Sequence, residues 1–251
     1  MALLRGANGC PWDQEQTHAS LRQHLLEEAF EVIETIDEEN WVNLADELGD
    51  LLLQIIFHAQ IAVEAGYFDI NDVLDNIINK LERRHPHVFG DETVKDAKEQ
   101  IVKWEKTKLK KEGKKSAIDG IPKALPALVK AYRMQNKAAS VGFDWPDIEP
   151  VLAKVKEEFD ELQNAMAAQD NDHIEEELGD VLFSLVNLSR FLHINPEDAL
   201  RRTIDKFSTR FRKVETELKD ENHDISDASL EEMDEIWERI KVEEKLKAGK
   251  Q

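Results

Sequence analysis

The sequence predicts an all-α protein built from two tandem helical repeats, and three observations support this fold class. Apolar residues recur at helical spacing along nearly the whole chain. Clean runs that alternate between apolar and polar residues, which are typical of strands, are lacking. Five acidic positions recur after 130 residues: Glu27, Glu28, Glu31, Glu47 and Asp50 correspond to Glu157, Glu158, Glu161, Glu177 and Asp180. A duplicated helical unit accounts for this register.

Each repeat is expected to contain several amphipathic helices in succession. In the first repeat, residues 1–112, the apolar spacing predicts helices over about 16–38, 41–65, 70–84 and 93–111. In the second repeat, residues 122–251, it predicts helices over about 123–140, 147–169, 172–192, 196–220 and 228–246. Most of the ten glycines and seven prolines lie at the breaks between these segments.

The apolar stripes of matching helices support the alignment of the two repeats. One stripe consists of Leu44, Leu48, Leu51, Leu52, Ile55, Ile56 and Ala59, and its counterpart of Leu178, Leu182, Leu185, Val186 and Leu188. Because each repeat has few helices to shield such stripes, we expect four-helix-bundle-type packing that is completed by dimerisation.

A lysine-rich segment, residues 113–121, is expected to link the repeats. It continues a basic stretch that begins at Lys103, and Pro122 follows it. We favour a solvated helix end and a linker for this segment. A phosphate-contacting role for its lysines is the alternative interpretation.

The composition limits the classes of partner. The formal net charge of −20 argues against nucleic-acid and anionic-membrane binding, because both require a basic surface. One cysteine allows no intrachain disulfide, which favours the cytoplasm. The first residues contain no apolar signal-peptide core, and the longest apolar stretch is too short to span a bilayer.

Within each repeat, the acidic residues are spaced to meet on one helical hairpin. Glu158 and Glu161 lie three residues apart, as do Glu177 and Asp180 on the next helix, so each pair shares a helix face. A polar turn near residues 170–172 allows these helices to pack antiparallel. Two like charges about 4 Å apart repel by about 4 kcal/mol at an effective dielectric constant of 20. This cost predicts a hard cation such as Mg²⁺ or Mn²⁺ between the carboxylates.

Other interpretations of the acidic pattern fit less well. Ferritin-like di-iron bundles use Glu-x-x-His, whereas both spacings here are carboxylate only, and a zinc site would need a Cys/His cluster. A single Glu-Glu-x-x-Glu is usually a solvated helix face. Here two acidic pairs recur in each repeat, and they border apolar runs, where charge is costly.

Three further residues are candidates for chemistry on a polyphosphate. Glu157 is a candidate to orient or deprotonate the attacking water. Lys206 and Arg210 lie four residues apart on a later helix and are candidates to clamp phosphate oxygens. Ordinary surface salt bridges remain an open alternative for these two cations.

Taken together, the motifs resemble the MazG family of nucleoside triphosphate pyrophosphohydrolases. The resemblance rests on Glu-Glu-x-x-Glu followed by Glu-x-x-Asp, and on GCPWDQEQTH, LEEAFEV, ELGDLLLQIIFHAQ, KLERRHPHVFG and VGFDW. It covers almost the whole chain, although related proteins carry a short helical segment before GCPWD, so this chain is expected to start late. The resemblance implies an all-α, obligately dimeric enzyme. Such an enzyme uses Mg²⁺ to cleave nucleoside triphosphates between the α and β phosphates, and it clears non-standard or surplus nucleotides.

The resemblance also implies roles for particular residues. The metal ligands would be Glu158, Glu161, Glu177 and Asp180, with Glu28, Glu31, Glu47 and Asp50 as a second site. The nucleotide contacts would be Lys154, Val155, Lys156, Glu157, Glu158, His173, Ile174, Glu175, Glu176, Asp180, Lys206, Phe207, Ser208, Thr209, Arg210 and Trp237.

The residues two helical turns beyond Asp50 and Asp180 favour the second repeat as the catalytic centre. The second repeat has Asn187 seven residues after that aspartate, where the first repeat has Phe57. Asparagine can hydrogen-bond a sugar or a base, whereas phenylalanine can only pack or stack, so we include Asn187 among the nucleotide contacts. A polar contact within the core is the alternative for Asn187. Likewise, Arg190 corresponds to Gln60.

Two other functions remain open at this point. One is a non-catalytic helical dimer that binds nucleotides or partner proteins as a sensor. The other is a narrower relative, such as a dCTP or phosphoribosyl-ATP pyrophosphohydrolase.

Overall fold

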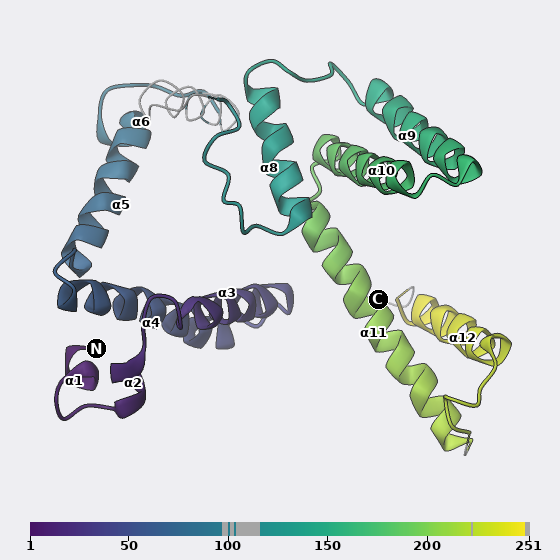
Figure 1. Ribbon diagram of the computed structural model, residues 1–251, viewed down its shortest axis with the longest axis horizontal. Coiled ribbons are helices and arrows are strands. Elements are labelled where there is room, and N and C mark those ends of the chain that lie inside the picture. The colour runs from purple at the N-terminus through teal and green to yellow at the C-terminus, as the bar shows by residue number, and fades with distance from the viewer. Residues whose placement is uncertain (97–99, 101–102, 104–115, 222, 249–251) are drawn as a thin grey trace. The chain divides into compact units, whose positions relative to one another are not determined.

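A computed structural model describes residues 1–96, 100, 103, 116–221 and 223–248 (Figure 1). The chain divides into two compact units, Met1–Gln100 and Ile101–Gln251. These described residues form helices and turns and contain no strand, so the predicted all-α fold class is confirmed. No described helix combines the length and the apolar character needed to cross a bilayer.

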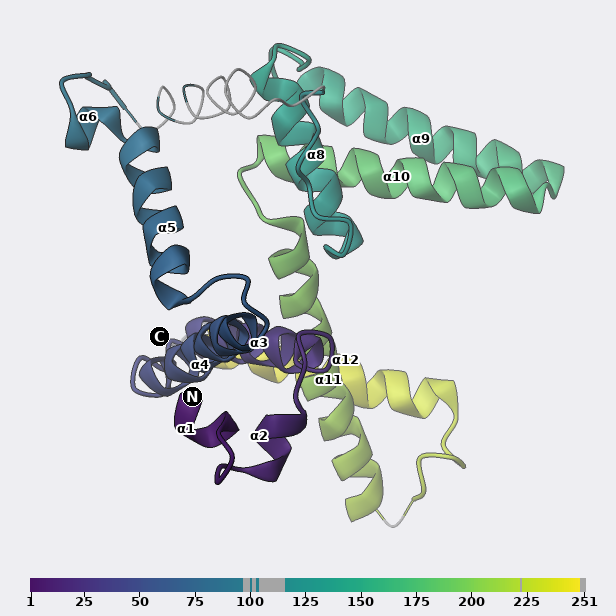
Figure 2. The same cartoon turned by 60° about the vertical axis from the view of Figure 1, so that its left-hand side comes forward.

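The first unit is organised around a helical hairpin. Its helices are α1 (Ala2–Arg5), α2 (Pro11–Glu15), α3 (Arg22–Asp37), α4 (Asn43–Glu64), α5 (Ile70–Arg84) and α6 (Pro86–Phe89). Helices α3 and α4 pack side by side (Figures 1 and 2). The turn between them contains Glu39, which has a positive φ of 54°, and Asn40, whose Oδ1 accepts a hydrogen bond from the Asn43 N–H. This turn brings the acidic residues of α3 opposite those of α4.

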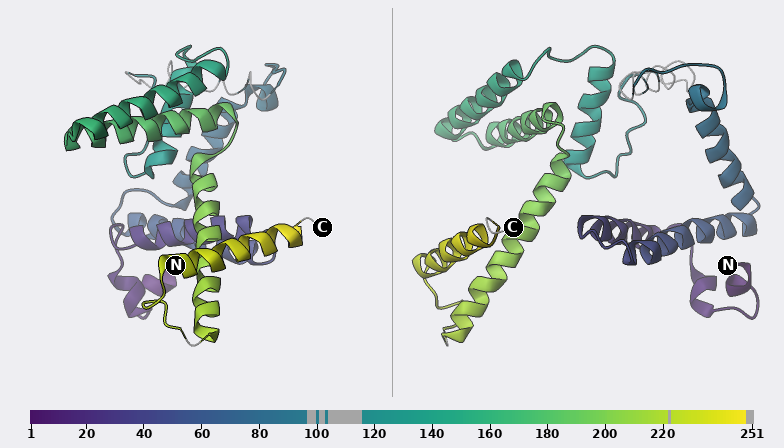
Figure 3. Two further views of the ribbon diagram at one scale, coloured as in Figure 1. Left: turned by 90° about the vertical axis from the view of Figure 1, so that its right-hand side faces the viewer. Right: turned by 180° about the vertical axis from the view of Figure 1, so that it is seen from behind.

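The second unit repeats the hairpin and adds a helical pair. Its helices are α8 (Ala127–Ser140), α9 (Glu149–Ala168), α10 (Asn171–Phe191), α11 (Pro196–Asp220) and α12 (Leu230–Ala248). Helix α8 packs on α10, α9 packs along α10, and α11 packs on α12 (Figures 1 and 3). The polar turn expected near residues 170–172 is present, with Gln169 in the left-handed region and the Asp170 side chain capping α10.

Buried apolar residues hold these helical pairs together. Val214 and Leu218 on α11 meet Ile236 and Ile240 on α12, and all four are nearly inaccessible to solvent. In the α9–α10 hairpin the fully buried positions are Val151, Ala165, Val181 and Val186. Complete burial of one such valine or leucine stabilises a fold by about 1.5–3 kcal/mol.

Large apolar side chains also remain exposed on several helices of the second unit, including α10 and α11. Leu178, Leu182 and Leu185 are exposed along α10. On α11, Ile204 and Phe207 are 54% and 55% exposed, although they recur at helical spacing. Among the described residues of the second unit, apolar stripes on α10 and α11 therefore stay uncovered.

The helix boundaries differ from the predictions mainly near the N-terminus. The segment 16–38 does not begin as one helix, because residues 17–21 form a turn. There the Thr17 and Ser20 hydroxyls accept hydrogen bonds from each other's backbone N–H groups, at 3.1 and 2.9 Å. Such local side-chain bonds compete with helix formation. The short helices α1, α2 and α6 were not predicted.

The predicted helix over 93–111 can be compared with the structure only in part. Residues 93–96 are not helical, whereas Gln100 and Lys103 are. Residues 97–99, 101–102 and 104–115 lie outside the described residues, and so do Trp104 and most lysines of the basic stretch. The expected boundaries of the repeats at 112 and 122 therefore stay predictions.

Candidate active site

The second repeat brings three of its four predicted metal ligands together. Glu158 and Glu161 come from α9, and Glu177 comes from α10. One carboxylate oxygen from each lies within 4.8 Å of the other two. Glu158 and Glu177 are buried at the interface of the hairpin, whereas Glu161 is exposed at its edge. The antiparallel packing of two helices has therefore produced a group of oxygen ligands of the kind that hard divalent cations prefer.

The first repeat forms a matching cluster with a different third partner. Here Glu28 on α3 meets Glu47 and Asp50 on α4, again with ligand oxygens within 4.8 Å of one another. Glu31, whose charge helps to raise the pKa of Glu28, does not belong to this triple. In the second repeat the residue outside the triple is Asp180.

The ionisation of these acids is perturbed in the direction that a cation would reverse. Partial desolvation by the neighbouring helix, followed by the charges of Glu177 and Glu158, raises the pKa of the exposed Glu161 above its ordinary value. Burial and neighbouring carboxylates raise the pKa values of Glu28 and Glu47 in the same way. Glu177 Oε2 is buried and has no hydrogen-bond partner in the described part of the chain. An unpaired buried carboxylate oxygen beside two other acids fits a metal site.

A lysine and a histidine contact the carboxylates of the second cluster. Lys154 Nζ lies 2.8 Å from both Glu157 Oε1 and Glu158 Oε1, and these hydrogen bonds raise the pKa of the lysine. His173 Nε2 lies 2.8 Å from Glu177 Oε1. The lysine is therefore held as an ammonium group at the edge of the acidic cluster, where an anionic ligand can reach it. Glu157 is exposed and faces this lysine rather than the other acids.

A cavity of about 560 Å³ adjoins the cluster between α8, α9, α10 and the loop after α8. Its volume is in the range of small-molecule sites. Much of its wall is apolar, with contributions from Met134, Phe143, Trp145, Val151 and Phe183. The cavity begins at the acidic cluster and is large enough to enclose an organic ligand with an anionic end.

The polar residues of the cavity lie at its two ends. Lys154, Glu158 and Asp180 line the end next to the acidic cluster. Asn187 and Arg190 lie two and almost three helical turns beyond Asp180 on α10, about 10 Å or more along the helix axis. Four of the predicted nucleotide contacts, Lys154, Glu158, Asp180 and Asn187, therefore line one cavity.

The other predicted nucleotide contacts do not line this cavity. Lys156, Glu157, Glu175 and Glu176 are exposed on the α9–α10 hairpin, Val155 and Ile174 are partly buried there, and His173 bonds Glu177. Lys206, Phe207, Ser208, Thr209 and Arg210 belong to α11, and Trp237 belongs to α12. Their roles stay predictions.

Within the chain, the residues of α11 and α12 have structural contacts. The Trp237 ring packs on Phe207 at 5.2 Å and lies against the buried cluster of α11 and α12. The guanidinium of Arg210 lies 5.8 Å from the Trp237 ring centre, and its Nε donates to Glu244 Oε2 at 2.8 Å. These contacts anchor the tryptophan in the core between α11 and α12.

The structure adds cavity residues that the sequence did not single out. Phe143 and Trp145 form part of the wall because Gly142, with φ of +93°, turns the chain after α8. Gln135, on α8, is buried and donates through Nε2 to the Phe183 carbonyl at 2.9 Å, which holds α8 against α10. The VGFDW motif was the available signal for the loop, but nothing local to it indicates that it folds over α10.

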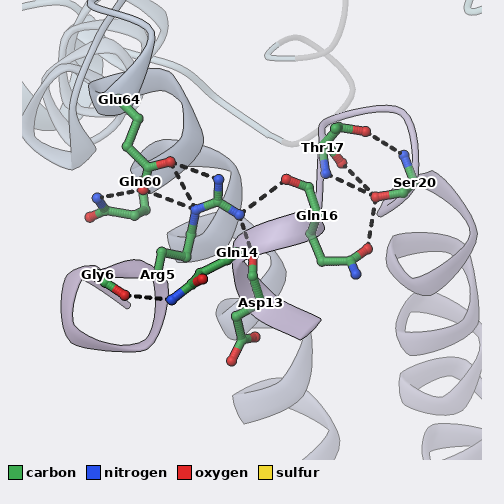
Figure 4. A network of polar contacts seen from close by, with 9 residues as sticks. All are labelled: Arg5, Gly6, Asp13, Gln14, Gln16, Thr17, Ser20, Gln60 and Glu64. Carbon is green, nitrogen blue, oxygen red and sulfur yellow. Dashed lines mark hydrogen bonds and ion pairs between the residues drawn. The ribbon is translucent and has the colours of Figure 1, made fainter. Parts of the chain in front are cut away.

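The first repeat has a buried aromatic ring at the position that corresponds to Asn187. Phe57, the counterpart of Asn187, is only 3% exposed. The guanidinium of Arg5 lies 5.5 Å from its ring centre, and Trp12 approaches it edge-on at 6.4 Å. Arg5 is held by Glu64 through bonds of 2.7–3.0 Å, and its Nη1 also donates to the Gln16 carbonyl at 3.0 Å (Figure 4). This repeat thus keeps an acidic cluster but fills the equivalent of Asn187 with a buried ring.

Comparisons with known proteins agree with the resemblance seen in the sequence. The model of the MazG nucleotide pyrophosphohydrolase domain matches twice, at residues 16–89 and 147–215. A protein of Escherichia coli strain K12 named nucleoside triphosphate pyrophosphohydrolase is 45% identical over 242 residues, which cover 94% of this chain and 92% of that protein.

Two further relatives match to a similar degree. The nucleoside triphosphate pyrophosphohydrolase/pyrophosphatase MazG of Thermotoga maritima is 48% identical, across 96% of this chain and 92% of its own. The uncharacterised protein YabN of Bacillus subtilis is 47% identical over 96% of this chain, which spans half of YabN. With the domain found twice and relatives of this identity along most of its length, the chain belongs to the MazG family of nucleotide pyrophosphohydrolases.

Proposed function

We propose that this protein hydrolyses nucleoside triphosphates between the α and β phosphates, giving a nucleoside monophosphate and pyrophosphate, with Mg²⁺ as its cofactor and Mn²⁺ as a possible substitute. The main support is that the acidic cluster of the second repeat adjoins a cavity large enough for a ligand. Glu158 belongs to both the cluster and the cavity wall. The names of the relatives support the substrate class. A role in clearing surplus or non-standard nucleotides in the cytoplasm follows as part of the same proposal.

In this proposal, different residues in and beside the cavity have different roles. Glu158, Glu161, Glu177 and Asp180 would hold the ion, and the ion would neutralise phosphate charge and activate water. Lys154 Nζ is held 2.8 Å from Glu158 and can attract the triphosphate from the same end. Glu157 is next to Lys154 and is the candidate base that orients or deprotonates the water. The apolar walls receive the nucleoside.

The second repeat is the proposed catalytic centre. Its cavity continues from the acids to Asn187, whereas Phe57 is buried at that position in the first repeat. The first cluster, Glu28, Glu31, Glu47 and Asp50, would then bind a cation without completing a nucleotide site. The net charge of −20 supports the proposal that nucleic acid is not a ligand.

The direct test is product analysis. The protein is incubated with a panel of nucleoside triphosphates and Mg²⁺, and the products are separated by ion-exchange chromatography. Monophosphate and pyrophosphate in equal amounts are expected. Diphosphate and inorganic phosphate would place cleavage at the β–γ bond and contradict the proposal, and binding without products would favour a sensor.

The raised pKa values predict a cation-dependent stability profile. Because desolvation and neighbouring acids raise the pKa of Glu161, Glu28 and Glu47, the folded chain binds more protons than the unfolded chain above the ordinary glutamate pKa. Stability without metal should therefore fall as pH rises from about 4.5 through the raised values, and stay reduced above them. Mg²⁺ is expected to offset this loss only where the acids are ionised.

The measurement is the thermal unfolding midpoint at about pH 4.5 and about pH 7.5, with and without Mg²⁺. The Mg²⁺-induced increase should be larger at the higher pH, and Glu161→Gln combined with Glu47→Gln should reduce it. An equal increase at both pH values would contradict the assignment of these acids to cation binding.

We also propose that two copies of the chain form the functional unit. The apolar residues left exposed on α10 and α11 need a covering surface, and Ile204 and Phe207 share the turns of α11 that carry Lys206 and Arg210. A second copy packed there would bury the stripe. It would also bring Lys206, Arg210 and Trp237 toward a neighbouring site, which accounts for their distance from the cavity of their own chain.

Light scattering after size-exclusion chromatography tests the dimer. The wild type is expected at twice the monomer mass. Ile204→Glu should shift it to the monomer, because a charge would be buried in the interface. Thr203→Glu, an exposed neighbour on the same helix, is the control and should remain dimeric. A monomeric wild type, or no response to Ile204→Glu, would contradict the proposed interface.

A further inference from the structure

A hydrogen-bonded chain of three residues lies at the end of the cavity away from the acidic cluster. Asn187 Oδ1 accepts hydrogen bonds from Arg190 Nε at 3.0 Å and Nη2 at 2.9 Å. Arg190 Nη1 in turn donates to Asp144 Oδ2 at 2.8 Å, and Nη2 donates to Asp144 Oδ1. All three residues line the cavity. The chain thus connects the loop after α8 to a side chain of α10.

The chemistry of arginine determines which way the asparagine amide points. A guanidinium can only donate hydrogen bonds, so the atom that faces it must be the carbonyl oxygen. Asn187 is buried, with an exposed fraction of 8%. Its amide nitrogen has no hydrogen-bond partner among the described residues, and the residue contributes to the cavity wall. Asn187 therefore presents an N–H donor, and no acceptor, to a ligand.

The first repeat also has an arginine–carboxylate pair near this position, but the two charged residues come from the opposite segments. There the arginine, Arg5, comes from the N-terminal segment and the carboxylate, Glu64, comes from α4 (Figure 4). In both repeats the guanidinium contacts the residue seven positions after the last aspartate, which is Phe57 in one and Asn187 in the other. The Phe57 ring offers no hydrogen-bond donor. The arginine therefore packs against a ring in the first repeat, whereas in the second repeat it orients the amide N–H donor of Asn187.

We propose that Arg190 and Asp144 are positioning residues that fix Asn187 as an obligate hydrogen-bond donor, so that the site selects nucleotides with an acceptor atom at this point of the nucleoside. The inference rests on the proposed function, because it assumes that the triphosphate lies at the acidic end. Asn187 lies about 10 Å along α10 from Asp180, at the distance where sugar or base follows the phosphates. A sugar hydroxyl oxygen and a base carbonyl or ring nitrogen share the required chemistry.

A double-mutant cycle tests the positioning role by binding rather than by turnover. Isothermal titration with α,β-methylene ATP and Mg²⁺ is measured for the wild type, Arg190→Met, Asn187→Ala and the double variant. Each single variant is expected to lose about 3- to 10-fold in affinity, which corresponds to one hydrogen bond. The double variant should lose no more than Asn187→Ala alone, because Arg190 acts through the asparagine. Unchanged affinity in Arg190→Met, or losses that simply add, would overturn the proposal.

Two further measurements separate this inference from the proposed function. Binding of inorganic tripolyphosphate with Mg²⁺ should be the same in all four proteins, and the circular dichroism should show equal helix content. If the wild type binds neither tripolyphosphate nor the ATP analogue, the proposed function fails. If it binds both and Arg190→Met has no effect, only the positioning role fails.

A sugar-modified analogue identifies the acceptor. The affinity ratio of wild type to Asn187→Ala is measured again with the 2′,3′-dideoxy form of α,β-methylene ATP. A ratio that falls to about one assigns the contact to a sugar hydroxyl, and a ratio that persists assigns it to the base.

Discussion

Glu161→Gln is expected to lower the rate of nucleoside triphosphate hydrolysis by about 10²–10³-fold or more. The substitution removes one negative charge from the cluster of carboxylates that Glu161 forms with Glu158 and Glu177. It keeps the size of the side chain. Because Glu161 is exposed, the fold should tolerate the change. The rate is measured as pyrophosphate released from a mixed nucleotide panel in Mg²⁺.

The duplication supplies a matched control for this experiment. Glu31→Gln is the same chemical change 130 residues earlier, at a position that is exposed as well. It should leave the rate close to that of the wild type, because Phe57 occupies the nucleoside position of the first repeat. The opposite pattern, with Glu31→Gln inactive and Glu161→Gln active, would assign catalysis to the first repeat.

Asn187→Phe is expected to give the second repeat the aromatic ring that the first repeat has at this position. The ring would enter the cavity, so that a nucleoside bound beside it would overpack the site, at a cost of about 1–3 kcal/mol. The lost hydrogen bond to the nucleoside contributes about 1 kcal/mol more. The affinity for α,β-methylene ATP should therefore fall about 30- to 1000-fold, as measured by isothermal titration.

Two comparisons show whether that loss belongs to the nucleoside end of the cavity. The affinity for tripolyphosphate with Mg²⁺ should be unaffected by Asn187→Phe, because Glu177 of the acidic cluster lies almost three helical turns away on α10. The mirror-image change, Phe57→Asn, should leave nucleotide affinity of the second repeat intact. Equal loss of tripolyphosphate and nucleotide affinity would mean that the substitution disturbs the hairpin as a whole.

Local signals in the sequence were sufficient for much of the fold. Helix α5 spans Ile70–Arg84 as predicted, because Asp69 and Asp72 form a capping box at its start. The α9–α10 hairpin follows from its polar turn and from apolar periodicity, and its acids meet because they are spaced three residues apart. These features depend on residues close to one another along the chain.

The remaining features depend on contacts between distant segments. Asp144 meets Arg190 across 46 residues, and Arg5 meets Glu64 across 59 residues, so neither pair has a local pattern. The turn at Thr17 and Ser20 overrode the helical periodicity through side-chain bonds to the backbone. In the proposed dimer, the partners of Lys206 and Trp237 would depend on how helices of two copies pack, which periodicity does not specify.

A crystal grown with Mn²⁺ and a non-hydrolysable nucleoside triphosphate tests the central assignment most directly, because manganese is located by its anomalous scattering. We predict an anomalous peak among the carboxylates of Glu158, Glu161 and Glu177, bonded to a phosphate oxygen, with the nucleoside reaching toward Asn187. Nucleotide bound elsewhere, or these carboxylates turned toward solvent with no peak between them, would contradict the assignment.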